Sequence, residues 1–352
     1  MSETPGAQPP ELSTQPARSE LVIDRAALRA NVRRVLGVLE GAELWAVVKA
    51  DGYGHGALTV AEIALGEGAT ALCVATLGEA LELRASLPEA RILVLGPTGP
   101  SDVRAAREAR LELVVSEPPW PEGIPLHAKV DTGMGRWGAA GLASTSADLS
   151  GLMSHLASAD TDPAFTELQI TRFAAIADNH PWLTRHLANS AGILRFPSAR
   201  FDAGRAGIAL YGLSPFAANP ADDGLRPVLS WRSLLARVRR LEPGESTGYG
   251  RRFVASEPTW IGIVPVGYAD GFRRDLTGTE VLVAGARVTV IGTVSMDALA
   301  VKLPGPLPAG TAVTLIGDGL LAEEHAAHAG TITYELVCGI DSTPARARRV
   351  VR

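Results

Sequence analysis

Short apolar runs alternate with longer amphipathic stretches from residue 21 to about residue 211. Eight of these runs lack the period-two alternation of half-exposed strands, which is typical of parallel strands buried on both faces. Apolar residues three or four positions apart indicate helices between them. The pattern predicts an α/β fold, either a (β/α)8 barrel or a doubly wound open sheet. The expected strands are residues 44–48, 71–75, 92–95, 113–115, 127–130, 149–154, 186–189 and 201–211, and the expected helices include 25–39, 58–64, 78–84, 101–109 and 164–177.

The residues that end these runs favour the barrel. Nearly every run ends in a polar or small residue, among them Lys49, His155, Ser190 and Arg205. In a TIM-type barrel the carboxyl ends of the strands build the active site, and a phosphate site often follows the last two strands. We therefore predict an N-terminal TIM-type (β/α)8 barrel over residues 21–225.

The pattern changes near residue 226. Short β-like pieces punctuated by Gly and Pro follow, and residues 323–329 form the one helical exception. This predicts a C-terminal mainly-β domain over residues 226–352. Residues 1–20 are rich in Pro, Ser, Thr and Glu without an apolar core, so we expect a disordered tail there and not a signal peptide. The β-like pieces include residues 234–238, 260–264, 281–283, 287–293 and 312–316.

Composition and charge remove several classes of function. The net charge of −5 gives no electrostatic reason to expect a nucleic-acid partner. No apolar stretch approaches the roughly 20 residues of a membrane span. Cys73 and Cys338 lie in apolar, strand-like runs, so we expect buried thiols in a reducing compartment and not a disulfide or a metal site. A cytoplasmic protein is the expectation.

Lys49 is the strongest candidate for chemistry. It ends the apolar run 44–48 and precedes a glycine-rich turn that contains Tyr53, and only two other lysines, Lys129 and Lys302, occur in the chain. A lysine at the end of a buried strand is costly unless it is paired, deprotonated or covalently used. The alternative is a lysine whose amine extends to water. The glycine-rich turn favours the reactive lysine, because its backbone can approach an anion closely.

Residues 47–56, V-V-K-A-D-G-Y-G-H-G, resemble nearly letter for letter the pyridoxal-phosphate lysine motif of alanine racemases. The resemblance runs from about residue 21 to about residue 334, and residues 129–136, K-V-D-T-G-M-G-R, are its second strong match. It implies a cytoplasmic homodimer that uses pyridoxal 5'-phosphate to interconvert L-alanine and D-alanine. D-Alanine would then supply synthesis of the peptidoglycan cell wall.

The resemblance also implies two acid/base groups on opposite faces of the substrate. Lys49 would bind the cofactor aldehyde covalently and act on the D enantiomer. Tyr249, in the β domain, would reach the active site of the partner subunit and act on the L enantiomer. Arg205 matches the arginine that faces the pyridine nitrogen of the cofactor. An always-charged guanidinium there keeps the nitrogen unprotonated, which suits racemisation better than transamination.

The remaining roles come from the same resemblance. The cofactor phosphate would lie among Tyr53, Ser190, the amides of Gly207 and Ile208, and Tyr334. Further cofactor contacts would be Leu95, Arg136, His155 and Asn189, substrate contacts would be Arg136 and the partner's Met296, and entrance or supporting residues would be Lys129, Asp160, His186, Tyr268, Arg274 and Asp297.

Some positions depart from the family pattern or leave a question open. Lys129 matches a position that is carbamylated in some members, and without that modification it would repel Arg136. Thr293 stands where the family usually has an arginine, Gly248 where serine is common, and Ala298 where glutamine is usual. Because a lost cation near the entrance could admit another substrate, a serine or broad-range amino-acid racemase of the same fold is the alternative.

Overall fold

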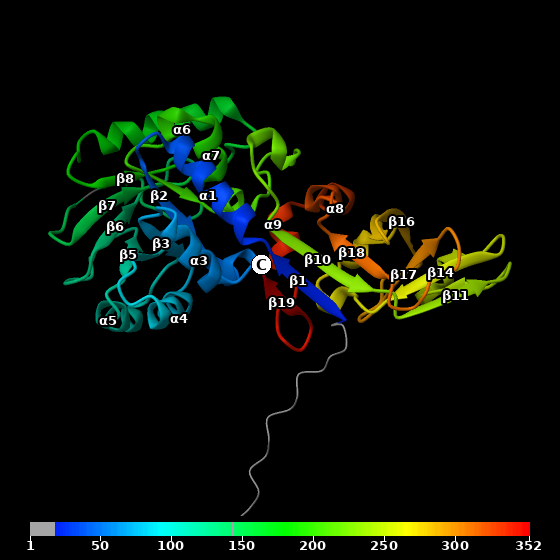
Figure 1. Cartoon of the computed structure of the whole chain (residues 1–352). Helices are drawn as coiled ribbons and strands as arrows, with labels where there is room; N and C mark the ends of the chain where they lie inside the picture. The colour runs from blue at the N-terminus through cyan, green and yellow to red at the C-terminus, as the bar shows by residue number, and fades with distance from the viewer. Residues whose placement is uncertain (1–17, 143) are drawn as a thin grey trace, which may run out of the picture.

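The structure is a computed structural model that describes residues 18–142 and 144–352. Its first part is a closed barrel of eight parallel strands, in which β9 pairs with β2 to complete the ring (Figure 1). The predicted TIM-type barrel is therefore confirmed. The strands are β2 (Glu43–Val47), β3 (Ala71–Val74), β4 (Ile92–Val94), β5 (Glu112–Val115), β6 (Leu126–Lys129), β7 (Leu149–Met153), β8 (Thr184–His186) and β9 (Ala203–Ala206).

Four helices of the barrel, α1, α4, α6 and α7, begin at residues whose side chains cap them. Asp24 accepts hydrogen bonds from the amides of Ala26 and Ala27 at the start of α1, and Thr76 forms a capping box with Glu79 at the start of α4. The helices are α1 (Arg25–Leu39), α2 (Lys49–Tyr53), α3 (Ala57–Gly66), α4 (Leu77–Ser86), α5 (Pro100–Glu108), α6 (Pro163–Ala177) and α7 (Ser190–Arg195), with 3-10 turns η1 (Pro197–Ala199), η2 (Ile208–Tyr211) and η3 (Pro220–Asp223).

The barrel is less regular than its repeat predicts. The connection from β5 to β6 contains no helix, and neither does the described part of the connection from β6 to β7, residues 130–142 and 144–148. The last strand is also shorter than the expected run 201–211, because the chain leaves β9 at Gly207 and turns into η2.

The second part is a mainly-β domain, as predicted, built on a sheet of nine strands in the order β11-β14-β17-β16-β15-β18-β10-β1-β19 (Figure 1). Its strands are β10 (Leu229–Leu234), β11 (Arg237–Leu241), β14 (Thr259–Val264), β15 (Glu280–Val283), β16 (Ala286–Ile291), β17 (Leu299–Leu303), β18 (Ala312–Ile316) and β19 (Arg348–Val351), joined by β1; a separate hairpin pairs β12 (Ser246–Thr247) with β13 (Phe253–Val254), and η4 (Tyr249–Arg251), η5 (Tyr268–Asp270) and η6 (Arg274–Leu276) are 3-10 turns.

The first strand of the chain departs from the sequence prediction. β1 (Ser19–Ile23) lies between β10 and β19 in this sheet, so it belongs to the β domain although its residues precede the barrel. It also begins inside the expected tail 1–20, of which residues 1–17 lie outside the described residues. The sequence of a single strand does not show which strands it pairs with. The placement of β1 in the β domain could therefore not be predicted from local pattern.

A second helix in the β domain was not predicted. After α8 (Ala322–Ala329), residues 333–338 form α9 (Thr333–Cys338), which packs against α2 of the barrel. Cys338 ends this helix and is exposed, contrary to the prediction, whereas Cys73 is buried as expected. Through α9 the β domain reaches the mouth of its own barrel, near the centre of Figure 1.

One continuous apolar core supports both domains. Its largest fully buried side chains include Trp45, Tyr211 and Phe173 in the barrel domain and Trp231 and Phe272 in the β domain. No helix in the described ranges is long and apolar enough to cross a membrane. Nor do the described residues contain a cluster of three or more His, Cys, Asp or Glu side chains that could hold a metal ion.

Candidate functional site

A cavity of about 290 Å³ lies at the carboxyl ends of the barrel strands, closed on one side by α9. Its lining includes every residue of the same chain that was predicted to contact the cofactor, except Arg136. Val47 and Cys338 also line it, and these two were not predicted. The lining residues are Val47, Lys49, Tyr53, Leu95, His155, Asn189, Ser190, Arg205, Gly207, Ile208, Tyr334 and Cys338.

The turn after Lys49 is left-handed. Ala50, Asp51 and Tyr53 all have φ between 51° and 53°, a conformation that costs roughly 1–2 kcal/mol for each non-glycine residue. Neighbouring elements hold the turn in place: Glu79 of α4 accepts from the Ala50 amide at 2.7 Å, and Arg349 of β19 pairs with Asp51. Both domains therefore fix the position at which Lys49 leaves its strand.

Lys49 itself is half-buried, and burial lowers the pKa of its amine, with a further lowering from the nearby Arg136 guanidinium. Both effects disfavour the ammonium form. A larger fraction of the amine is therefore neutral and nucleophilic than for a lysine in water.

One wall of the cavity is a hydroxyl-rich turn where the end of β9 meets the start of α7. The Oγ atom of Ser190 accepts from the amides of Gly207 at 3.0 Å and Ala209 at 3.3 Å, so its own proton is left to donate. A Cβ atom on Gly207 would lie 2.4 Å from the Tyr53 hydroxyl, so only glycine lets this hydroxyl reach the turn. The Gly207 amide was predicted to bind the cofactor phosphate, but within the chain it already donates to Ser190.

Two tyrosine hydroxyls complete this wall. Tyr53 and Tyr334 lie with ring centroids 6.1 Å apart, and burial raises the pKa of both phenols. Asp160, exposed at the rim, raises the pKa of Tyr334 further. Both hydroxyls thus remain protonated and can donate to an anion.

Arg205 occupies the floor of the cavity and is 3 % exposed. Its guanidinium donates to the carbonyl oxygens of His186 at 2.7 Å and Ser154 at 2.8 Å, and to the ring of His155 at 3.2 Å. Burial lowers its pKa to about 10, so it stays charged at neutral pH. Burial and the Arg205 charge hold the pKa of His155 well below its usual range, which keeps that ring neutral.

Arg136 and Lys129 lie outside the cavity, next to it. Lys129 is buried, and its Nζ lies 5.3 Å from the ring centroid of Trp137, while the Cζ of Arg136 lies 4.8 Å from the same ring. The two cations therefore share one aromatic side chain. The sequence prediction of their mutual repulsion missed Trp137, although it directly follows Arg136.

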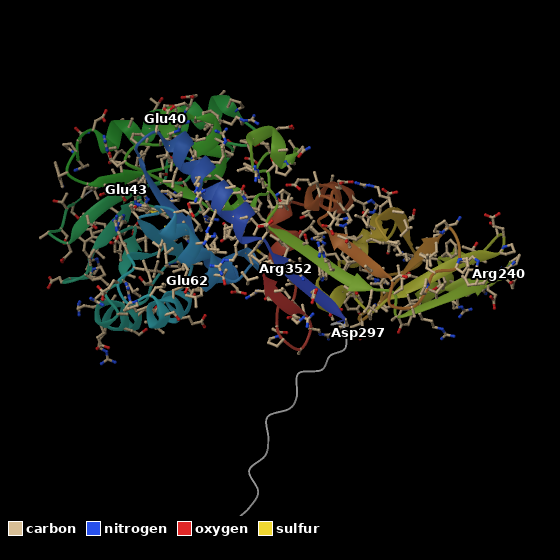
Figure 2. All side chains as sticks on the ribbon, in the orientation of Figure 1. Glu40, Glu43, Glu62, Arg240, Asp297 and Arg352 are labelled. Atoms are coloured by element: carbon tan, nitrogen blue, oxygen red, sulfur yellow. The ribbon has the colours of Figure 1, made fainter. Side chains whose placement is uncertain are left out.

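The other predicted residues of the β domain are not brought to Lys49 within the chain. Tyr249 is 73 % exposed and lines a different cavity, of about 440 Å³, with Tyr268, Arg274 and Val294. Met296 is also exposed. Asp297, labelled on the β domain in Figure 2, pairs with Arg346 at 2.5 Å.

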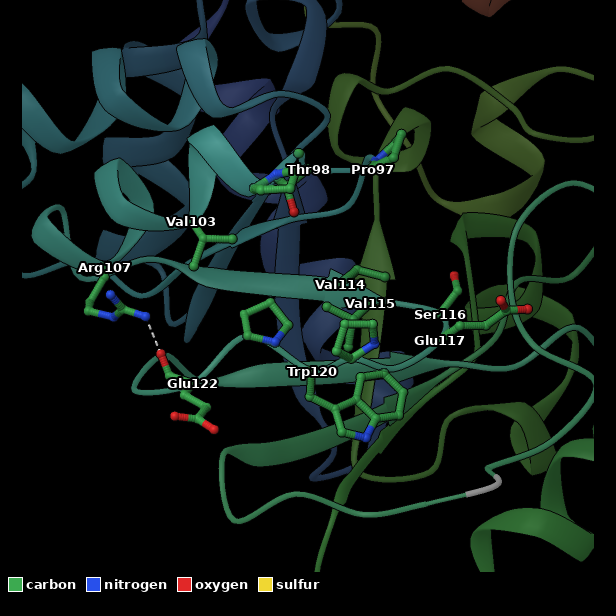
Figure 3. A pocket seen from close by; sticks show the side chains of 14 residues that line it. Pro97, Thr98, Val103, Arg107, Val114, Val115, Ser116, Glu117, Trp120 and Glu122 are labelled. Carbon is green, nitrogen blue, oxygen red and sulfur yellow. Dashed lines mark hydrogen bonds between the residues drawn. The ribbon is translucent and has the colours of Figure 1, made fainter.

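A larger cavity, of about 630 Å³, lies between α5 and the helix-free connection from β5 to β6. Figure 3 shows Val103, Val115 and Trp120 around it, with Arg107 bonded to the Glu122 carbonyl at its rim. It contains no lysine, histidine or cysteine. The chemistry-bearing residues gather at the smaller cavity.

A partly desolvated lysine, a buried arginine and a hydroxyl-lined turn meet at the mouth of the barrel, beside a separate β domain. This combination is that of a two-domain barrel enzyme. Comparison with known proteins gives the family. The family model for the N-terminal domain of alanine racemase matches residues 23–215, and that for the C-terminal domain matches residues 228–350.

Individual relatives agree over nearly their whole length. The alanine racemase of Levilactobacillus brevis is 39% identical over 366 residues, which cover 94% of this chain and 98% of that protein. The alanine racemase of Geobacillus stearothermophilus is 40% identical over 349 residues, or 88% and 87% of the two chains. The crystal structure of alanine racemase from E. faecalis matches with a TM-score of 0.88 at 35% identity, covering 95% of this chain and 98% of that one. The chain belongs to the alanine racemase family, and its enzyme class is that of the pyridoxal-phosphate-dependent amino-acid racemases.

Proposed function

We propose that the chain uses pyridoxal 5'-phosphate to interconvert L-alanine and D-alanine. The observation that carries the proposal is the cavity that joins the partly desolvated Lys49 amine, the buried Arg205 and the hydroxyl-lined turn. The donor set fits the cofactor. Ser190, Tyr53, Tyr334 and the Ile208 amide would bind the phosphate dianion, with Gly207 leaving room for it.

The ring of the cofactor would lie on the remaining lining residues, Leu95, His155 and Asn189, with its nitrogen toward Arg205. When bound, the cofactor supplies an aldehyde for Lys49 and an electron sink that acidifies the α-hydrogen of the amino acid. Arg205 has only donors, so it can bond the ring nitrogen without transferring a proton to it.

Two groups of the protein would move the proton. Lys49 takes the α-proton of D-alanine at its Nζ, and Tyr249 of the partner subunit takes that of L-alanine at its phenol oxygen on the opposite face. The high exposure of Tyr249 and Met296 supports a homodimer in which this surface completes the neighbouring site. Arg136 and the partner's Met296 amide would hold the substrate carboxylate, with His186, Lys129, Asp160, Tyr268, Arg274 and Asp297 supporting the site and its entrance.

The product supplies the physiological role. D-Alanine from this reaction would enter peptidoglycan precursors, which places the enzyme in the cytoplasm. A serine or broad-range racemase is the second candidate, and Thr293 at the usual arginine position is the observation that favours it.

Racemisation of purified holoenzyme with L-alanine and, in parallel, L-serine tests the substrate. We expect chiral chromatography to show alanine reaching a near-equal mixture much faster than serine. Faster serine racemisation would favour the second candidate, and no racemisation of either would reject the two-base mechanism.

Mixed dimers test the shared site. Lys49→Ala and Tyr249→Phe should each be inactive alone. When both are co-expressed, random pairing should restore roughly one quarter of the wild-type activity, since one of the two sites in each mixed dimer is intact. If both residues acted within one chain, the mixture would remain inactive.

A further inference from the structure

One carboxylate organises the loop that carries Arg136. The Oδ1 atom of Asp131 accepts hydrogen bonds from the amides of Gly133 at 2.9 Å and Met134 at 2.8 Å. The Gly135 amide lies between the two carboxylate oxygens, 2.9 Å from Oδ2 and 3.2 Å from Oδ1. Arg136 is the next residue. Three consecutive amides therefore converge on one side chain immediately before the residue proposed to hold the substrate carboxylate.

The Asp131 side chain is an anion at neutral pH. Its partial burial raises the pKa, but the amides of Gly133, Gly135 and Met134 lower it more, so that the pKa lies below its ordinary value. Within the described part of the chain these three amides have no other hydrogen-bond acceptor. A charged acceptor makes each bond stronger than one between neutral groups. The carboxylate is therefore the main anchor of this turn.

The two ends of the loop are held in other ways. The Asp131 amide donates to the Ala139 carbonyl at 2.8 Å, and the Ala139 amide donates to the Lys129 carbonyl at 3.0 Å, which closes the loop against the end of β6. On the barrel side, Arg172 of α6 donates to the Thr132 carbonyl at 3.1 Å. These main-chain hydrogen bonds reach Thr132 at one end and Ala139 at the other. The turn before Arg136 lies between them and depends on the Asp131 carboxylate.

The Arg136 side chain has few contacts of its own. Its guanidinium lies over the ring of Trp137, with Cζ 4.8 Å from the centroid, and it forms no ion pair or hydrogen bond with the other described residues. Trp137 belongs to the same loop and is 45 % exposed. The direction in which Arg136 leaves the main chain is therefore set by the turn that precedes it.

We propose that Asp131 is a positioning residue for Arg136: by holding the amides of residues 133–135 it fixes the main chain from which Arg136 reaches the substrate carboxylate. The proposal rests on the proposed function, because it assumes that Arg136 binds that carboxylate. Without Asp131 the three amides bond to water, and Gly133 and Gly135, with φ of 135° and 67°, can leave their present conformations freely. The change stays local, because the ends of the loop keep their own hydrogen bonds.

The test compares Asp131→Ala with Asp24→Ala in the holoenzyme. Asp24 is a matched control, because this exposed carboxylate accepts from two amides, at 2.8 and 2.9 Å, but does so at the start of α1. Propionate, which has the carboxylate of alanine without the amine, is the probe, and ligand-observed NMR measures its binding. In Asp131→Ala we expect the Kd for propionate and the KM for alanine to rise roughly tenfold, with kcat much less affected. In Asp24→Ala all three should equal those of wild type.

Hydrogen exchange followed by mass spectrometry shows whether the turn is released. Amides 133–135 should exchange faster in Asp131→Ala than in wild type or Asp24→Ala. Faster exchange with an unchanged propionate Kd and KM would overturn the proposal, because Asp131 would then shape the loop without positioning Arg136. Equal losses of affinity in Asp131→Ala and Asp24→Ala would overturn it as well.

Asp131→Asn provides a graded variant, and it replaces Asp131→Ala if that protein does not fold. Its one side-chain oxygen can still accept from Gly133 and Met134, whereas its NH2 group faces the Gly135 amide, donor to donor. The propionate Kd should therefore rise by less than in Asp131→Ala, and a wild-type Kd in Asp131→Asn with fast exchange of residue 135 would contradict the proposal. Propionate binding and hydrogen exchange require no racemase activity. Absent racemisation by wild type would reject the proposed function and is thus distinguishable from failure of this proposal.

Discussion

The hydroxyl of Thr293 donates a hydrogen bond to the main-chain carbonyl oxygen of Tyr249, across a distance of 2.9 Å. Thr293 is only 6 % exposed, whereas Tyr249 is among the most exposed aromatic residues in the described ranges. A Cβ atom at Gly248, which precedes Tyr249, would lie 2.9 Å from the Thr293 amide nitrogen, so the two segments are in close contact. The residue that departs from the family pattern thus supports the backbone of the proposed second acid/base group.

Thr293→Val should therefore lower kcat for alanine racemisation roughly tenfold while leaving the cofactor bound, because a small displacement of a catalytic group costs far more rate than affinity. Thr293→Ser keeps the hydroxyl and serves as the matched control, with kcat close to wild type. The measurement is the initial rate in both directions together with the KM. A loss in Thr293→Ser with a wild-type kcat in Thr293→Val would show that the methyl group, and not the hydrogen bond, supports Tyr249.

The sequence predicted the parts of the site that follow from local pattern. Lys49 and Arg205 stand at the ends of apolar runs, and barrel geometry brings such positions together. The contribution of Tyr334 rests on α9, a six-residue helix too short to show a helical period. The pairing of β1 with β19 and the link from His127 to Glu112 depend on contacts between residues far apart in sequence or across the barrel interior, and no periodicity indicates them.

Trp137→Leu tests the ring shared by Lys129 and Arg136. Burial and the nearby arginine charges lower the pKa of Lys129 to about 8, and the aromatic face offsets part of the repulsion between the two cations. Without that face we expect Arg136 to be displaced and the KM for alanine to rise roughly fivefold, given about 1 kcal/mol for such a contact.

Trp182→Leu is the control for this change, since Trp182 is an exposed tryptophan that contacts His180 instead. Its KM should equal that of wild type. Mass spectrometry with added bicarbonate provides a second readout, because a carbamate on Lys129 would be anionic and would pair with Arg136 directly. A KM for Trp137→Leu equal to that of the control would mean that Lys129 and Arg136 do not depend on the ring.

Arg18 anchors the start of β1 to the loop that carries Tyr268. Its guanidinium pairs with both oxygens of Asp270, at 2.8 and 2.7 Å, and Asp270 is 1 % exposed. Arg18→Gln leaves this buried carboxylate with Arg346 at 3.6 Å as its nearest charged partner. We expect a loss of about 2–3 kcal/mol in the free energy of unfolding, measured by urea titration. Arg232→Gln, which breaks an exposed pair with Asp318, should cost less than about 1 kcal/mol.

His55 gives the protein a defined sensitivity to acid. Its ring is fully buried against Tyr211, its Nδ1 donates to the Tyr53 carbonyl at 2.8 Å, and burial lowers its pKa from the ordinary 6.5 to about 4. Above pH 6.5 the ring is neutral in both the folded and the unfolded chain and contributes nothing to the pH dependence. Between pH 6.5 and 4 the unfolded chain binds the extra proton, so the free energy of unfolding falls as the pH falls.

The full effect of this one histidine is about 3 kcal/mol, from the size of the pKa change. Urea unfolding of wild type and His55→Gln at several pH values between 7.5 and 4.5 measures it. Burial also lowers the pKa values of His127, His155, His186 and His325, so the stability of both proteins should decline over this range. The free energy of unfolding should depend less steeply on pH in His55→Gln, by the equivalent of up to one proton bound on unfolding. Equal slopes in the two proteins would show that His55 is protonated in the folded chain as readily as in the unfolded one.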